Sequence, residues 1–79
     1  MSTMRLQTFA GLHDLTITGQ AEVHKDHFAR YYIDGVRVAF THAERAFTVL
    51  TCVDGNKHYV MTTDWQEMER TEGARSASE

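Results

Sequence analysis

The sequence predicts an α+β fold: an antiparallel sheet of four to five strands followed by one C-terminal helix. Two Asp-Gly pairs, Asp34-Gly35 and Asp54-Gly55, each separate runs in which apolar and polar residues alternate. This arrangement is the strongest short-range signal for a β-hairpin. A helix is indicated after Asp64, a residue type that commonly caps a helix N-terminus. The length of 79 residues fits one domain with one core.

Two strands are predicted before the first Asp-Gly pair. The alternation in residues 4–9 is short, whereas that in residues 15–23 is typical of a strand with one buried face. Gly19 lies within the second segment and indicates a bulge or a bend. A turn is expected at residues 24–27. The buried face of the second strand is expected to hold Leu15, Ile17, Gly19, Ala21 and Val23.

Residues 28–33 and 36–41 are predicted to form the first Asp-Gly hairpin. Pairing across a two-residue loop gives one apolar face, and a slip of one residue would mix the two faces. The face expected in the core holds Ala29, Tyr31, Ile33, Val36, Val38 and Phe40. The opposite face displays Phe28, Arg30, Tyr32 and Arg37.

Residues 47–53 and 57–62 are predicted to form the second hairpin. Its loop is either the Asp54-Gly55 pair alone or that pair extended by Asn56. The first of these two strands is apolar on both faces, which is typical of a central strand covered on its second side. Between the hairpins, residues 42–46 are either a single helical turn, from the spacing of Thr41 and Glu44, or a polar loop.

The helix is predicted over about residues 64–72. Asp64 and Glu67 have the spacing of reciprocal capping residues, and Trp65 and Met68 share a face that can dock on the sheet. Gly73 is expected to end the helix. The predicted domain is therefore residues 1–73, with residues 74–79 as a disordered tail.

The net charge of −3 comes from the C-terminal part of the chain. Residues 1–63 hold six acidic and six basic residues, so the sheet lacks the basic excess that duplex binding requires. A single cysteine excludes an internal disulfide. The sequence contains no recognisable signal peptide and no stretch of apolar residues long enough to span a membrane. We therefore expect a cytoplasmic protein that does not bind membranes.

The sequence predicts neither catalysis nor a cofactor. Cys52 lies among apolar residues, where a thiol is normally inert, and no phosphate loop or Gly-x-Ser-x-Gly motif is present. His24 and His27 have a spacing that suits metal ligands, but two ligands do not hold a metal. The third ligand would have to be His13, His42 or His58, so no metal site is predicted.

The outer face of the first hairpin is the candidate contact surface, formed by Phe28, Arg30, Tyr32 and Arg37. Exposed aromatic and arginine side chains are typical of protein interfaces, and they also stack and pair with single-stranded nucleic acid. We predict protein binding, with single-stranded nucleic acid as the alternative. A third interpretation is that the helix simply covers this face. The acidic residues expected to attract a basic partner are Glu67, Glu69 and Glu72.

In size and architecture the chain resembles phage-encoded anti-CRISPR proteins that inhibit type I systems. The features shared are a small acidic chain without proline, the two Asp-Gly hairpins and the helix that carries Trp65. The resemblance implies a non-catalytic inhibitor in the cytoplasm of the host cell. Apart from the resemblance, a homodimeric scaffold that uses a free strand edge is a further hypothesis, so the chain is expected to be a monomer or a homodimer. Its partner would be a host protein or ribonucleoprotein, such as the CRISPR Cascade surveillance complex, which the inhibitor would block sterically. No functional residue is carried over from the family.

Overall fold

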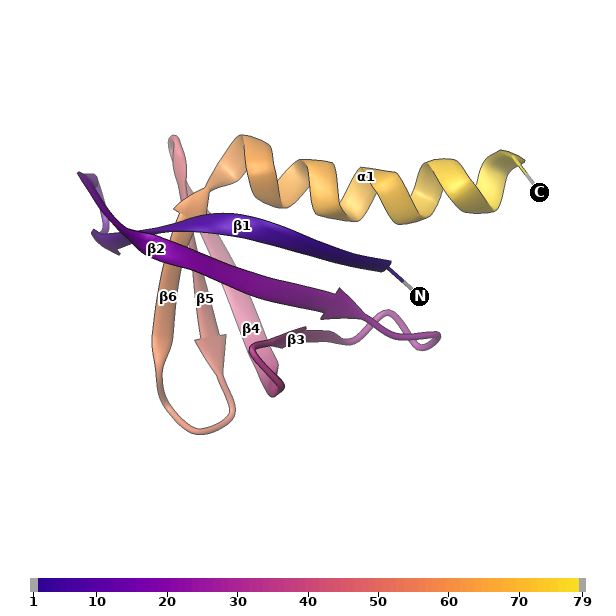
Figure 1. Ribbon diagram of the computed structural model, residues 1–79, viewed down its shortest axis with the longest axis horizontal. Helices are drawn as coiled ribbons and strands as arrows, with labels where there is room; N and C mark the ends of the chain where they lie inside the picture. The colour runs from indigo at the N-terminus through magenta and orange to yellow at the C-terminus, as the bar shows by residue number, and fades with distance from the viewer. Residues whose placement is uncertain (1, 79) are drawn as a thin grey trace.

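Six antiparallel strands and one helix make up the computed structural model, which describes the backbone of residues 2–78 and the side chains of residues 3–70 (Figure 1). The strands are neighbours in chain order, and β6 returns to β1 through Phe9 and Tyr59 to close a barrel. The predicted class, an antiparallel sheet with a C-terminal helix, is confirmed. The elements are β1 (Ser2–Gly11), β2 (Asp14–Lys25), β3 (Tyr31–Ile33), β4 (Val36–Glu44), β5 (Phe47–Cys52), β6 (Lys57–Met61) and α1 (Thr62–Ser78).

The strand number is six instead of the predicted four to five, because the weakly patterned segment 4–9 belongs to the full strand β1. This strand pairs with β2 from Ser2 to Gly11. Residues 42–46 form neither a helical turn nor a polar loop, since β4 continues to Glu44 and pairs there with Phe47. The intervening turn places Arg45 at a φ of 58°.

A bulge interrupts the β1–β2 ladder next to Gly19, as predicted. Thr8 pairs with Gly19 and Phe9 pairs with Ile17, so Thr18 is the extra residue. The expected buried face is correct only after the bulge, where Ala21 is buried. Ile17 lies before the bulge and is more than half exposed, as is Leu15, because this end of the strand lies outside the core.

The first hairpin has the predicted turn, with positive φ at both Asp34 and Gly35, and Ile33 pairs with Val36. Its first strand is shorter than predicted, because residues 26–30 form a loop that includes Phe28. A second bulge, at Ala39, shifts the register between β4 and β5. Phe40 was expected in the core, but the bulge turns its side chain outward and leaves it 63% exposed.

The second hairpin has a loop of more than two residues, but Val53 and not Asn56 extends the Asp54-Gly55 pair. The backbone N–H of Cys52 donates to the carbonyl of Asn56 at 2.9 Å, so Asn56 pairs with the last residue of β5 and closes the loop. β5 is central, as expected, because it pairs with both β4 and β6. Leu50 and Cys52 face the core, whereas Val53, at the end of the strand, is exposed.

Helix α1 lies beside β1 and supplies Trp65 and Met68 to the core, as predicted (Figure 1). It is longer than the predicted segment 64–72: it begins at Thr62 and continues through Gly73 to Ser78. A glycine in a helix interior costs only about 1 kcal/mol, so Gly73 does not have to end the helix. Glu79, the last residue of the predicted tail, lies outside the described residues. The core cluster consists of Leu6, Ala21, Val23, Ile33, Val38, Leu50, Cys52, Val60, Trp65 and Met68.

Candidate functional site

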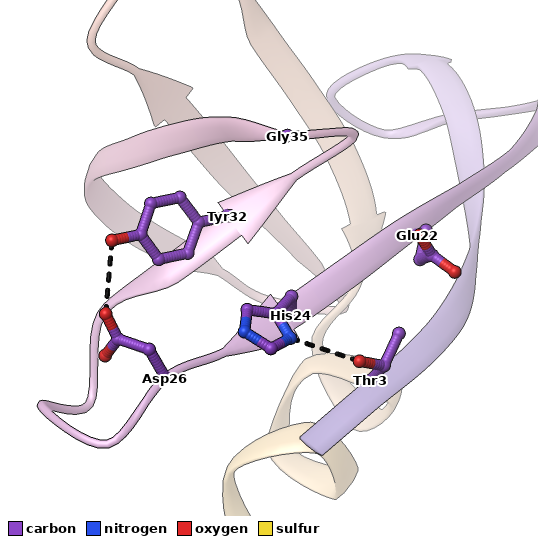
Figure 2. A pocket seen from close by; sticks show the side chains of 6 residues that line it. All are labelled: Thr3, Glu22, His24, Asp26, Tyr32 and Gly35. Atoms are coloured by element: carbon purple, nitrogen blue, oxygen red, sulfur yellow. Dashed lines mark hydrogen bonds between the residues drawn. The ribbon is translucent and has the colours of Figure 1, made fainter. Parts of the chain in front are cut away.

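The loop between β2 and β3 is built around the carboxylate of Asp26. Its Oδ1 accepts hydrogen bonds from the backbone N–H groups of Phe28 and Arg30, both at 2.9 Å. Its Oδ2 accepts from Arg30 Nε at 2.9 Å and from the Tyr32 hydroxyl at 3.1 Å (Figure 2). Three of the four residues of the predicted contact surface are therefore fixed by one carboxylate, which the sequence predicts only as part of a turn.

Hydrogen bonds from Arg30 and Phe28 make the Asp26 carboxylate unusually acidic. Burial disfavours the charged form, but the backbone N–H groups of Arg30 and Phe28, the Arg30 side chain and the Tyr32 hydroxyl together outweigh it and hold the pKa of Asp26 well below its ordinary value. The unfolded chain therefore binds a proton at Asp26 at a pH where the folded chain does not.

We expect Asp26→Asn to lower stability most at neutral pH, with a difference from the original protein that shrinks as the pH falls. A depressed folded-state pKa stabilises the fold above the unfolded value of about 4, and that stabilisation is lost as the pH falls towards the folded pKa. Urea midpoints of both proteins measured at pH 7, 5, 3 and 2 check this. A difference that is equal at pH 7 and pH 3 would contradict it.

Tyr32 pairs with Arg37 across β3 and β4, as predicted, and it also lies near a feature that the sequence does not indicate. It borders an open hollow of about 460 Å³ on the outside of β1, β2 and β3 (Figure 2). In this hollow His24 Nδ1 is 3.1 Å from the Thr3 hydroxyl, and the rings of His24 and Tyr32 are 6.1 Å apart. The hollow is lined by Thr3, Glu22, His24, Asp26, Tyr32 and Gly35.

A second depression, which we call the β4 groove, brings the two predicted arginines together. Its volume is about 270 Å³, and Arg30 and Arg37 lie in its walls together with Glu69 of α1. The rings of Tyr31 and Trp65, whose centroids are 4.7 Å apart, lie in the same groove. The lining residues are Ala29, Arg30, Tyr31, Arg37, Val38, Ala39, Phe40, Thr41, Trp65 and Glu69.

Two phenylalanines stand exposed beside this groove. Phe28 is 75% exposed and its ring lies 4.8 Å from the Arg30 guanidinium, a cation–π contact. Phe40 lines the groove directly. The helix therefore leaves the predicted surface uncovered, because Trp65 packs on Tyr31, which belongs to the inner face of the sheet.

The predicted acidic residues are placed differently from one another. Glu69 lies in the β4 groove, whereas Glu67 forms an ion pair with Arg70 on the exposed side of α1. The side chain of Glu72 lies outside the described residues.

Phe40 is a contact residue that the sequence does not predict, because alternation alone places it in the core and no sequence signal marks the bulge at Ala39.

Cys52 and Glu44 also have shifted pKa values. Burial, helped by the charges of Asp54 and Asp34, raises the pKa of the Cys52 thiol and keeps it protonated. Glu44 accepts contacts from His13 at 3.3 Å and His42 at 3.5 Å, and the bond from His13 is the main cause of its lowered pKa. Among the side chains of residues 3–70, no group of three or more His, Cys, Asp or Glu residues is placed to hold a metal ion.

Comparisons with known proteins give no match to a family model, a curated protein or a solved structure. No helix in the described part of the chain combines the length and the apolar composition that crossing a bilayer requires.

Proposed function

We propose that this chain is a small non-catalytic protein-binding domain, and that the β4 groove with Phe28 beside it is its contact surface. The observation that carries the proposal is the outward position of Phe40, which the bulge at Ala39 removes from the core and places beside Arg37 and Trp65. Exposed aromatic and arginine side chains around a depression are the residue types that dominate binding energy at protein interfaces.

The charges around the groove support a protein partner over single-stranded nucleic acid. Nucleic-acid sites need a continuous basic track along the phosphates. Here Arg30 is paired with Asp26 at 2.9 Å, and Glu69 places a negative charge in the groove beside Arg37. These opposite charges suit a partner surface of mixed charge, and they weaken attraction to a polyanion.

Binding is expected to depend on Phe40 and Arg37. Phe40→Ala and Arg37→Glu should each weaken the complex by about tenfold or more, as is typical of interface hot spots. Both side chains are exposed, so the fold should be retained, which circular dichroism can verify. The measurement is recovery of partner protein from host lysate on beads that carry the original chain or each variant, followed by affinity measurement with the purified partner.

Val53→Ala is the matched control, because Val53 is also exposed but lies outside the groove. It should recover the partner as well as the original chain does. Equal recovery by all four proteins would contradict the proposed surface. Retention of single-stranded oligonucleotides at low salt, lost on Tyr32→Ala, would favour the nucleic-acid alternative.

The most specific form of the proposal follows the resemblance to phage-encoded inhibitors of type I CRISPR systems. The partner is then Cascade or the nuclease it recruits, and the domain blocks one of their surfaces sterically. A purified type I complex should lose target-DNA binding or nuclease recruitment when the chain is added in equal amount. Full activity in the presence of excess chain would remove this form of the proposal and leave protein binding itself open to the bead experiment.

A further inference from the structure

One edge of β4 has no strand beside it over most of its length. β5 pairs with one edge from Val38 to Glu44, whereas β3 reaches only Val36 and Arg37 on the other. Within residues 2–78, no strand pairs with this second edge over residues 38–44. Such an edge presents backbone donors and acceptors that another extended segment can use.

This free edge borders the β4 groove. Residues 37–41 form one wall of the groove and residues 29–31 form another, while Trp65 and Glu69 of α1 lie at the side. Natural proteins protect free edges with charged residues, proline or bulges; residues 38–41 contain no charged residue and no proline, and the bulge at Ala39 leaves Phe40 exposed at this edge. The edge is therefore open to pairing at the same place where the aromatic side chains of the groove are available.

The geometry points to an extended peptide segment of the partner protein, which adds to the free edge of β4 as a further strand. Strand addition obtains its affinity from main-chain hydrogen bonds and its specificity from pockets for alternate side chains. The groove offers such pockets, with the exposed ring of Phe40 beside the Tyr31–Trp65 pair. This inference rests on the proposed function, because it names the form in which the partner enters the same groove.

The charge of Arg37 defines the side chains that the segment should carry. Arg37 is exposed, and none of the ion pairs found among residues 3–70 includes it. An acidic residue of the segment would complement this guanidinium, and an apolar residue would pack against Phe40. The expected occupant thus alternates apolar residues with at least one Asp or Glu.

The walls of the groove favour a single segment over a second copy of this domain. A volume of about 270 Å³, limited by residues 29–31 and by α1, leaves room for one extended chain. The edge strand of another folded domain would bring its neighbouring strands against the loop and the helix. A flexible loop or terminus of a partner does not meet this obstacle.

A random dodecapeptide library displayed on phage, selected on the immobilised full chain, provides the probe. We expect enrichment of alternating apolar sequences that contain an acidic residue. Arg37→Glu and Phe40→Ala should each weaken a selected synthetic peptide about tenfold, whereas Val53→Ala should not. Replacing the acidic peptide residue by Lys should restore binding to the Arg37→Glu variant.

Backbone N-methylation of the peptide tests strand addition directly, because it removes donors without changing side chains. Methylation at alternate positions that face β4 should weaken binding about tenfold, and methylation at the intervening positions should not. Hydrogen exchange measured by nuclear magnetic resonance should show slower exchange at alternate amides of residues 38–44 when the peptide is present.

The failures of the two proposals are distinguishable. Peptide binding that depends on Phe40 but ignores N-methylation would overturn strand addition and leave the groove as a protein-binding site. If no peptide is enriched but the bead experiment still captures a partner through the groove, strand addition is likewise overturned and the groove remains a protein-binding site. Peptides unaffected by any groove substitution would overturn strand addition, and the bead experiment then decides the proposed function alone. Self-association that Phe40→Ala abolishes would assign the edge to a second copy and overturn the inference.

Discussion

Trp65→Ala is expected to lower the free energy of unfolding by about 3–5 kcal/mol, the range for a buried aromatic side chain. Trp65 is the largest side chain that α1 supplies to the core, and it is almost completely buried. Its ring also packs on Tyr31 at a centroid distance of 4.7 Å. Because a domain of 79 residues has a total stability of about 4–12 kcal/mol, this single truncation should leave the fold close to its limit.

Urea denaturation followed by circular dichroism measures this effect. Gln66→Ala is the matched control, since Gln66 is the next residue of α1 and is exposed, and it should change stability by no more than about 0.5 kcal/mol. Similar midpoints for the two variants would show that the helix does not contribute to the core. Trp65→Phe should retain part of the stability, because it keeps an aromatic ring against Tyr31.

Leu50→Ala is expected to cost about 2–5 kcal/mol, because truncation of a buried leucine loses transfer free energy and leaves a cavity. Leu50 is fully buried at the centre of β5, the strand that pairs with both β4 and β6. The cavity would therefore lie in the middle of the barrel, where the surrounding strands are held by hydrogen bonds on both sides and cannot easily move inward.

Val53→Ala provides the comparison for Leu50, because Val53 follows the same strand but is 60% exposed. Its effect should remain within about 0.5 kcal/mol. Thermal and urea unfolding of both variants measure the two values. Equal losses for Leu50 and Val53 would contradict the assignment of the core to the Leu50 side of β5.

The sequence could predict the elements whose local chemistry is distinctive. Asp34-Gly35 fits the positive φ angles of its turn, so the pairing of Ile33 with Val36 followed correctly from the pattern. Trp65 was recognised as the helix residue that reaches the core. In these cases short-range preference and tertiary packing favour the same conformation.

The remaining features depend on contacts that are distant in the sequence. Arg45 adopts a positive φ in a tight turn, a conformation that an arginine does not signal, so the β4–β5 turn could not be recognised. The bulge at Ala39 depends on how β4 fits β5, which alternation within one strand does not report. Phe40 was consequently assigned to the core.

The candidate site was also predicted only in part, because some of its contacts join residues outside the predicted strand pattern. Tyr32 was correctly expected beside Arg37, because this cross-strand pair follows from the turn, and Arg30 lines the same groove as Arg37. The hydrogen bond from the Tyr32 hydroxyl to Asp26 and the hollow that Tyr32 borders were not predicted, because both depend on the loop at residues 26–30. The carboxylate of Asp26 accepts several hydrogen bonds and so fixes the loop at residues 26–30, which the strand periodicity of the sequence does not predict.

The order of strands in the barrel has a kinetic consequence. Each strand pairs with the one that follows it, so five of the ladders join segments that are close along the chain. Distant segments come together where β1 meets β6, through the single pair Phe9–Tyr59, and where the adjoining helix α1 packs beside β1. The entropy cost of closing a long loop is therefore concentrated in one late event, and the preceding hairpins can assemble rapidly by local zippering.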